Sequence, residues 1–248
     1  MFTVQDRDRA RDHVLAKARG DPRVVAGAVV GSLALGDGDR WSDLDLTFAV
    51  ADGVPLRDVL EDWTRDLSAG LDATRRFALP HGASIYRVFL LPGCLQLDLS
   101  FTPASAFGAA GPRFRLLFGG AADRPAAPPP PAHDILGQAV HHALRARFCL
   151  ERGRTWQAEH WIRGVRDLAL SLACLRRGLP AQHGRGLDAL PRGVPEGLEG
   201  ARAQSRERGE LLRALGEAIA GLLREAGEAG ALARKVEPQL RELTAAWD

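Results

Sequence analysis

The segment "VVGSLALGDGDRWSDLDLTFAV", residues 29–50, places two aspartates in a run that otherwise has the composition of a buried strand. Asp43 and Asp45 alternate with leucines, and residues two apart in a strand share a face, so both carboxylates point the same way. An isolated ionised carboxylate is costly to bury unless it is paired or binds a metal. The fold therefore has to place a compensating charge beside this strand.

A second apolar run, "LQLDLSF" at residues 95–101, repeats the pattern with Asp98. If the two strands are neighbours in one sheet, three carboxylates meet. Three like charges raise the pKa of at least one of them unless a divalent cation lies between them. Oxygen ligands of this kind suit Mg²⁺, which bridges protein carboxylates to substrate phosphates. The alternative is that the three aspartates lie in surface strands and pair with arginines.

Gly31 and Ser32 lie between the first apolar run and the aspartates. Glycine allows a phosphate to approach the backbone, and Ser32 begins an expected short helix, "SLALG", with a hydroxyl and amides available to an anion. The "DGD" at residues 37–39 is interpreted as a turn, because Asp and Gly favour turns. The pair Gly31–Ser32 is therefore a candidate phosphate contact.

This order of residues resembles the DNA polymerase β-like nucleotidyltransferase superfamily, whose pattern is a Gly-Ser, an Asp-x-Asp and a distal Asp or Glu. The similarity covers about residues 23–102, with eleven positions from Ser32 to Asp43. It implies that Asp43, Asp45 and Asp98 are the metal-binding and catalytic residues and that Gly31 and Ser32 contact the nucleotide phosphates.

The same resemblance implies a reaction. Members transfer a nucleoside monophosphate from an NTP to a hydroxyl and release pyrophosphate with two Mg²⁺ ions, and ATP is the expected donor. Asp43 and Asp45 would hold the nucleotide-side ion. Asp98 would hold the acceptor-side ion and take the proton of the acceptor hydroxyl.

The apolar periodicity predicts an α+β chain: a small mixed β-sheet nucleotidyltransferase domain at 1–120, a proline-rich linker at 121–132 and an all-α helical bundle domain at 133–248. The linker contains four consecutive prolines, which continue neither a helix nor a central strand. The expected helices are 6–19, 55–71, 134–152, 155–178, 198–226 and 228–246. The expected strands are 23–32, the aspartate run, a hairpin of 84–91 with 94–101, and 114–120.

This two-part organisation resembles stand-alone bacterial nucleotidyltransferases that modify small molecules, such as aminoglycoside and lincosamide adenylyltransferases. The resemblance implies a small hydroxylated acceptor such as an aminoglycoside-like antibiotic. Two alternatives are an antitoxin-type nucleotidyltransferase that modifies a protein partner and a nucleotide-binding regulator that has lost catalysis. The intact Asp43, Asp45 and Asp98 count against the last.

Three polar residues share one face of the expected helix 155–178. Glu159, Arg163 and Arg166 are spaced by four and three positions, so they form either a solvated face or the wall of a cleft. In a cleft, Arg163 or Arg166 would bind the triphosphate and Glu159 the acceptor. Trp41, just before the aspartates, would stack on a base or acceptor, or pack at the rim.

Composition narrows the class of partner. Lys plus Arg number 33 against 31 for Asp plus Glu, so the chain has no broad basic field for long nucleic acids. The N-terminus does not resemble a signal peptide, no run is long enough for a membrane span, and three scattered cysteines favour the cytoplasm. The state of assembly stays open, and the apolar helices after residue 198 offer an interface.

Overall fold

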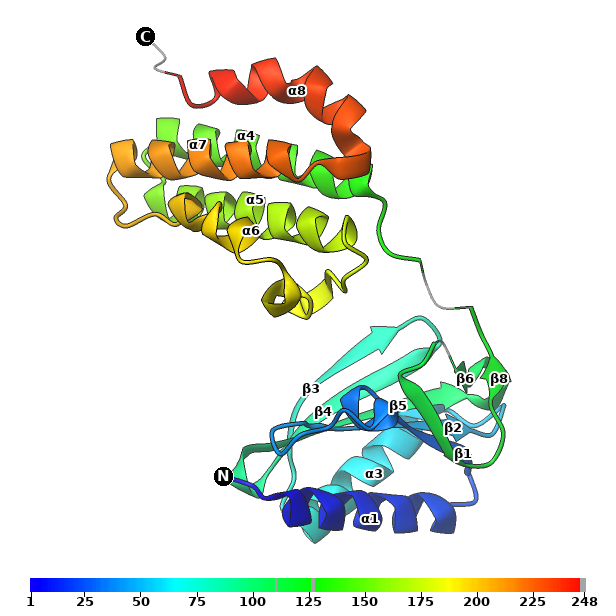
Figure 1. Ribbon diagram of the computed structural model, residues 1–248. Helices are drawn as coiled ribbons and strands as arrows, with labels where there is room; N and C mark the ends of the chain where they lie inside the picture. Colours follow the sequence, from blue (N-terminus) through cyan, green and yellow to red (C-terminus); the bar gives the residue numbers. More distant parts are fainter. Residues whose placement is uncertain (110, 126–127, 246–248) are drawn as a thin grey trace. The chain divides into compact units, whose positions relative to one another are not determined.

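The chain folds into two compact units, Met1–Ala127 and Pro128–Asp248. The computed structural model describes residues 1–109, 111–125 and 128–245. The first unit is a mixed sheet with helices, and the second is helical (Figure 1), which confirms the α+β fold class. Within the described ranges, every helix falls short of the length and apolar character needed to span a membrane.

The sheet of the first unit has the strand order β3-β4-β5-β2-β1-β7. Strands β2 and β5 are parallel, and all other neighbours are antiparallel, so the sheet is mixed. The predicted hairpin is present as β4 and β5, joined by a short turn at Pro92–Cys94. The strands are β1 (Val24–Val30), β2 (Leu44–Val50), β3 (Thr74–His81), β4 (Ser84–Leu91), β5 (Leu95–Pro103) and β7 (Phe114–Phe118), with a separate pair of β6 (Gly108–Ala109) and β8 (Ala122–Asp123).

Helices α1 (Val4–Gly20) and α3 (Leu56–Leu71) cover one face of this sheet (Figure 1). Leu44, Leu46 and Phe48 on β2 are fully buried on that face and pack in one cluster with Trp63 of α3. Each strand therefore presents its apolar residues to the helices. The alternate residues, including the aspartates, lie on the opposite face.

Strand β3 was not expected from the sequence. Thr74–His81 contains Arg75, Arg76 and Pro80, which lower the strand signal. It is an edge strand that pairs only with β4, and edge positions tolerate proline and charge. The local sequence therefore does not predict β3. The strand forms because β4 offers a free edge.

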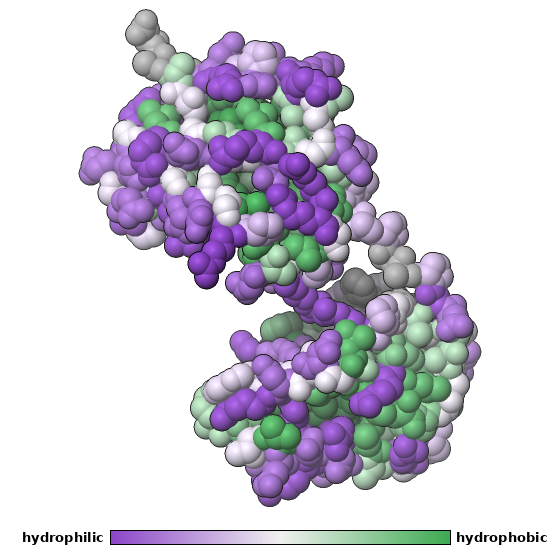
Figure 2. Space-filling view, in the orientation of Figure 1, coloured by the Kyte–Doolittle hydropathy of each residue, from purple (hydrophilic) through white to green (hydrophobic). Residues whose placement is uncertain are grey.

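The second unit is built from α4 (Ala132–Glu151), α5 (Thr155–Leu175), a short α6 (Gly193–Glu196), α7 (Arg208–Arg224) and α8 (Gly230–Glu242). One apolar cluster joins α4, α5, α7 and α8. The visible face of this unit is mostly hydrophilic, with apolar residues between charged ones (Figure 2). The proposed linker at 121–132 holds β8 and the first residue of α4, and its residues 126–127 lie outside the described part of the chain.

The predicted helix 198–226 is wrong over its first third. Helix α7 begins only at Arg208, and the preceding segment is a single turn at Glu199–Ala201 followed by irregular chain. Arg213 of α7 donates to the carbonyl oxygens of Gly200 and Arg202 at 2.8 and 3.2 Å. These carbonyls are bound by a side chain instead of by helical amides, so the segment folds back on α7.

Candidate functional site

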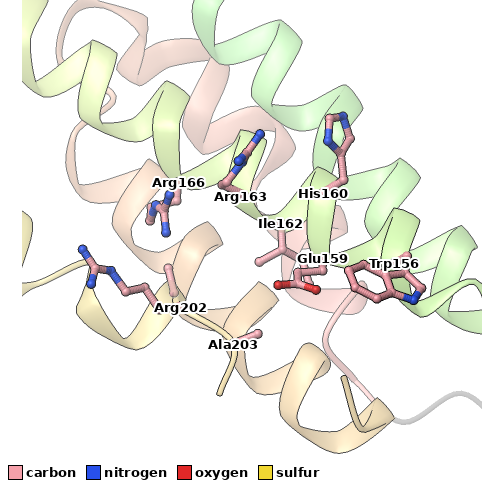
Figure 3. A pocket seen from close by; sticks show the side chains of 9 residues that line it. Trp156, Glu159, His160, Ile162, Arg163, Arg166, Arg202 and Ala203 are labelled. Atoms are coloured by element: carbon pink, nitrogen blue, oxygen red, sulfur yellow. The ribbon is translucent and has the colours of Figure 1, made fainter. Parts of the chain in front are cut away.

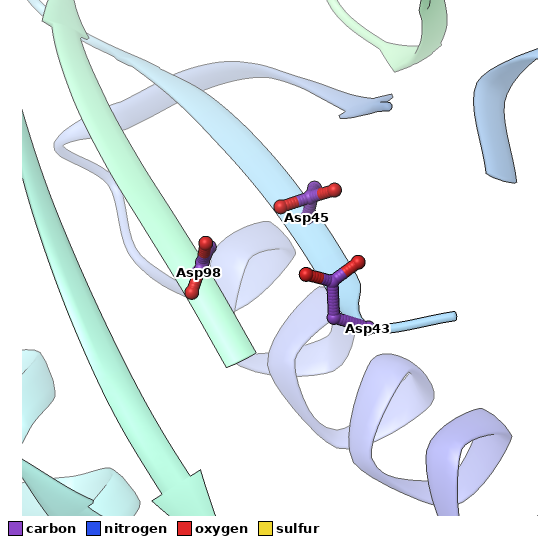
Figure 4. Close-up of side chains that lie close together, drawn as sticks. All are labelled: Asp43, Asp45 and Asp98. Carbon is purple, nitrogen blue, oxygen red and sulfur yellow. The ribbon is translucent and has the colours of Figure 1, made fainter. Parts of the chain in front are cut away.

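The three aspartates come together on the face of the sheet opposite α1 and α3. Asp45 on β2 and Asp98 on β5 are directly paired in register, and Asp43 lies just before β2. One carboxylate oxygen from each of the three lies within 4.8 Å of the others, and all three residues are half-buried (Figure 4). The parallel pairing of β2 with β5 therefore brings together carboxylates that lie more than fifty positions apart.

Asp98 has a carboxylate oxygen that is buried without a hydrogen-bond partner. Its Oδ2 accepts a hydrogen bond from Gln96 Nε2 at 3.3 Å, whereas its Oδ1 is buried without a hydrogen-bond partner. Burial, and then the charge of Asp43, raise the pKa of Asp98 to about 6, against the opposing effects of Gln96 and Arg76. A buried anionic oxygen without a partner is the atom that a cation would satisfy.

The donor set fits Mg²⁺. All three side chains offer hard oxygen ligands, and half-burial leaves room for the waters that Mg²⁺ usually keeps. Among the described residues no other group of three or more His, Cys, Asp or Glu side chains is close enough to hold a metal ion.

Gly31 has a role that the sequence did not indicate. Its backbone has φ 76° and ψ −149°, a conformation essentially restricted to glycine, and a Cβ at this position would overlap Oδ2 of Asp45. Its amide donates to the carbonyl oxygen of Arg113 at 3.2 Å. Gly31 therefore makes room for the Asp45 carboxylate, where the sequence predicted room for a phosphate.

Ser32 is the first residue of α2 (Ser32–Leu35), as expected. Its hydroxyl makes no hydrogen bond with another residue in the described ranges, so it is available to a ligand. Gly31 places Ser32 beside the carboxylates, because Gly31 directly contacts Asp45.

Arg7 positions the loop that carries Asp43, and sequence reasoning missed it. The side chain, only 6% exposed, extends from α1 and donates from Nη1 to the carbonyl oxygens of Asp39 and Ser42 at 2.6 and 3.0 Å. The carboxylate of Asp39 accepts from the Trp41 amide at 2.8 Å, and the Ser42 amide donates to the Asp39 carbonyl oxygen at 3.3 Å, so the turn follows Asp39 and does not span the predicted residues 37–39. No spacing in the sequence points to Arg7, because α1 approaches this loop only in the folded chain.

Trp41 lies on the same loop with 59% of its surface exposed. The guanidinium of Arg40 lies 4.0 Å from the centre of its ring. Its position two residues before Asp43 puts it at the rim of the carboxylate site.

A hydroxyl-lined pocket of about 200 Å³ adjoins the carboxylates along β2 and β5. Thr47 and Ser100, each two residues beyond a site aspartate, are hydrogen-bonded at 2.8 Å, and Ser84 and Thr102 are bonded at 2.7 Å. Thr47 and Ser100 share the face of the aspartates, because each lies two residues beyond one of them in a strand. These residues satisfy one another and extend a polar strip away from the site.

Glu159, Arg163 and Arg166 line a pocket of about 280 Å³ within the helical unit. Trp156 and Glu159 lie at one end, and Arg166 and Arg202 at the other (Figure 3). Arg166 pairs with Asp167 at 2.8 Å. Arg163 makes no hydrogen bond or ion pair with another residue of the described ranges. The three residues predicted from the sequence thus share one pocket, in a different unit from the aspartates.

The comparisons with known proteins find similarity among solved structures. No family model matches the chain, and no curated protein matches it. Among solved structures, an aminoglycoside 6-adenyltransferase from Bacillus subtilis aligns with 96% of this chain and 98% of its own, at 14% identity and a TM-score of 0.40. The chemistry of this chain is therefore inferred from the residues of its own site.

Proposed function

We propose that this chain is a Mg²⁺-dependent nucleotidyltransferase that moves a nucleoside monophosphate, AMP from ATP, to a hydroxyl of a small acceptor and releases pyrophosphate. The observation that carries the proposal is the cluster of Asp43, Asp45 and Asp98 with the buried, unpartnered Oδ1 of Asp98. Gly31 and Ser32 lie beside this cluster, so the Gly-Ser pair and the aspartates of the resembled motif lie close together. This proximity supports the proposal.

Asp43, Asp45 and Asp98 would hold the metal. When bound, Mg²⁺ neutralises the triphosphate and the charge that develops as pyrophosphate leaves. Ser32 donates its hydroxyl hydrogen to a phosphate oxygen, and Asp98 accepts the proton of the acceptor hydroxyl. The acceptor oxygen forms a bond to the α-phosphorus, the bond from the α-phosphorus to the bridging oxygen breaks, and that oxygen leaves with pyrophosphate.

Two further assignments belong to the same proposal. Arg163 and Arg166 bind the triphosphate and Glu159 contacts the acceptor, which is consistent with their shared pocket and with the free guanidinium of Arg163. Trp41 stacks on the base or the acceptor, which its exposed side chain permits.

The test replaces the metal ligands. Asp43→Asn and Asp45→Asn should each reduce Mg²⁺-dependent pyrophosphate release from ATP by at least 100-fold, because each removes charge neutralisation worth about 3 kcal/mol or more in the transition state. Binding of Mn²⁺, measured by electron paramagnetic resonance, should weaken in parallel. Asp37→Asn is the matched control, since Asp37 is an exposed aspartate on the same loop.

Melting curves establish that the two variants fold. Near-native pyrophosphate release in either variant at saturating Mg²⁺ would reject the metal assignment. If the wild-type chain binds Mn²⁺ but turns over no NTP, the result would instead favour a nucleotide-binding regulator.

A further inference from the structure

The face of the sheet that carries the aspartates becomes apolar on the β4 side of the carboxylates. Tyr86, Val88 and Leu90 of β4 lie on this face, because the intervening Arg87 and Phe89 point to α3 and the buried core. Leu79 and Phe77 of β3 join them, since they pair in register with Tyr86 and Val88. We call these five residues, Phe77, Leu79, Tyr86, Val88 and Leu90, the apolar platform.

The platform directly adjoins Asp98. Val88 is the register partner of Asp98, and Tyr86 is the partner of Ser100. Gly31, Ser32 and Asp45 lie on the other side of Asp98, toward β1. Across the sheet, from β1 toward β3, Gly31 and Ser32 come first, Asp45 and Asp98 follow, and the platform comes last.

Much of the platform is accessible. The exposed fractions are 55% for Leu79, 44% for Phe77 and 38% for Tyr86, whereas Val88 is buried at its centre. Side chains of this size rarely gather on a surface without a partner that covers them. Their position side by side on one face of two paired strands offers an apolar surface to a ring system.

The charge of the strands that form the platform is unfavourable to a cationic ligand. Residues 74–91, which form β3, β4 and their turn, contain three arginines and no aspartate or glutamate. Arg87 is buried against α3 and Arg75 pairs with Glu61 at 3.7 Å, whereas the charge of Arg76 acts on Asp98. Within residues 74–91 a polyamine would meet positive charge and no carboxylate, and the neighbouring carboxylates of β2 and β5 are the metal ligands.

We propose that the acceptor is a hydroxylated ring compound without cationic groups, which lies with an apolar face on the platform and presents its hydroxyl to Asp98. This inference rests on the proposed function for the identity of the reaction. It narrows the acceptor class away from aminoglycosides, whose amino groups require acidic partners.

The test uses the full chain with 4-methylumbelliferone, a flat fluorescent phenol, and kanamycin, a polycationic aminoglycoside. Fluorescence anisotropy should show binding of 4-methylumbelliferone in the absence of metal and ATP. Leu79→Asp should weaken this binding by at least tenfold. Leu116→Asp is the matched control, because Leu116 is 42% exposed on β7 at the other edge of the sheet, and it should change the affinity less than twofold.

With Mg²⁺ and ATP, 4-methylumbelliferone should stimulate pyrophosphate release and kanamycin should not. Tighter binding of kanamycin, or equal effects of Leu79→Asp and Leu116→Asp, would overturn the inference. So would a lowered melting temperature of Leu79→Asp with no change in phenol binding, because the platform would then pack against the chain itself.

The design separates the two proposals. If the wild-type chain neither binds Mn²⁺ nor turns over ATP, yet binds the phenol in a way that depends on Leu79, the proposed function is refuted. The ligand preference of the platform is then retained. Metal-dependent turnover with kanamycin alone would retain the proposed function and refute the acceptor class.

Discussion

At the scale of single residues, the candidate site depends on a glycine as much as on its aspartates. Gly31→Ala should lower the free energy of unfolding by at least about 1 kcal/mol more than Gly36→Ala, because both glycines have a positive φ but only Gly31 has a backbone essentially restricted to glycine and a Cβ that would overlap Asp45. Urea denaturation of the two variants measures the difference. Equal losses would show that the contact with the carboxylate is not what requires glycine.

The protonation of Asp98 makes a second prediction at this scale, for the metal-free chain in EDTA. Because its pKa is raised to about 6, the folded chain retains a proton that the unfolded chain has lost between about pH 4 and pH 6. The stability of the wild-type chain should therefore fall as the pH rises through this window. The penalty is fully present above pH 6 and absent below pH 4.

Asp98→Asn should remove this penalty. We expect the variant to be more stable than the wild type by about 1 kcal/mol at pH 7.5, a value reduced for partial solvent screening, and equally stable near pH 4. Melting curves across this range check the prediction, with Asp37→Asn as the control. A difference between wild type and Asp98→Asn that does not vary with pH would contradict it.

At the scale of elements, helix α1 has a task beyond covering the sheet. Arg7→Met should weaken Mn²⁺ binding by about tenfold, because the loop that presents Asp43 loses both hydrogen bonds to α1, each worth about 1 kcal/mol. Arg9→Met is the control, since Arg9 is exposed and pairs with Asp6 of its own helix. Unchanged Mn²⁺ affinity in a folded Arg7→Met chain would show that the loop is held by other contacts.

At the scale of the whole molecule, the two units have separate cores and the carboxylates belong to the first alone. Leu215→Ala, at a fully buried position of α7, should lower the stability of the helical unit by about 2–5 kcal/mol. It should leave Mn²⁺ affinity within twofold at temperatures where that unit stays folded. Calorimetry and paramagnetic resonance measure the two quantities, and a coupled loss would show that the helical unit is required to assemble the metal ligands.

The amino-acid sequence determined which residues share a face. The alternation in the two aspartate runs depends only on the geometry of a strand, so the common orientation of Asp43 with Asp45, and of Asp98 with Ser100, followed from local structure alone. The apolar stripes of α3 and α5, the hairpin β4–β5 and the α+β class followed from the same kind of local pattern. These features need no information about distant residues.

Tertiary structure decided what lies next to what. The parallel pairing of β2 with β5 unites the aspartates, yet α3, β3 and β4 lie between those strands in the chain. The contact of Gly31 with Asp45 and the reach of Arg7 to its loop arise only once these elements pack. The edge strand β3 forms because β4 leaves an edge to pair with, and the apolar platform exists because the pairing of β3 with β4 places its residues on the face opposite α3. Such neighbours are selected by burial and hydrogen bonding over the whole fold, which no local pattern of residues encodes.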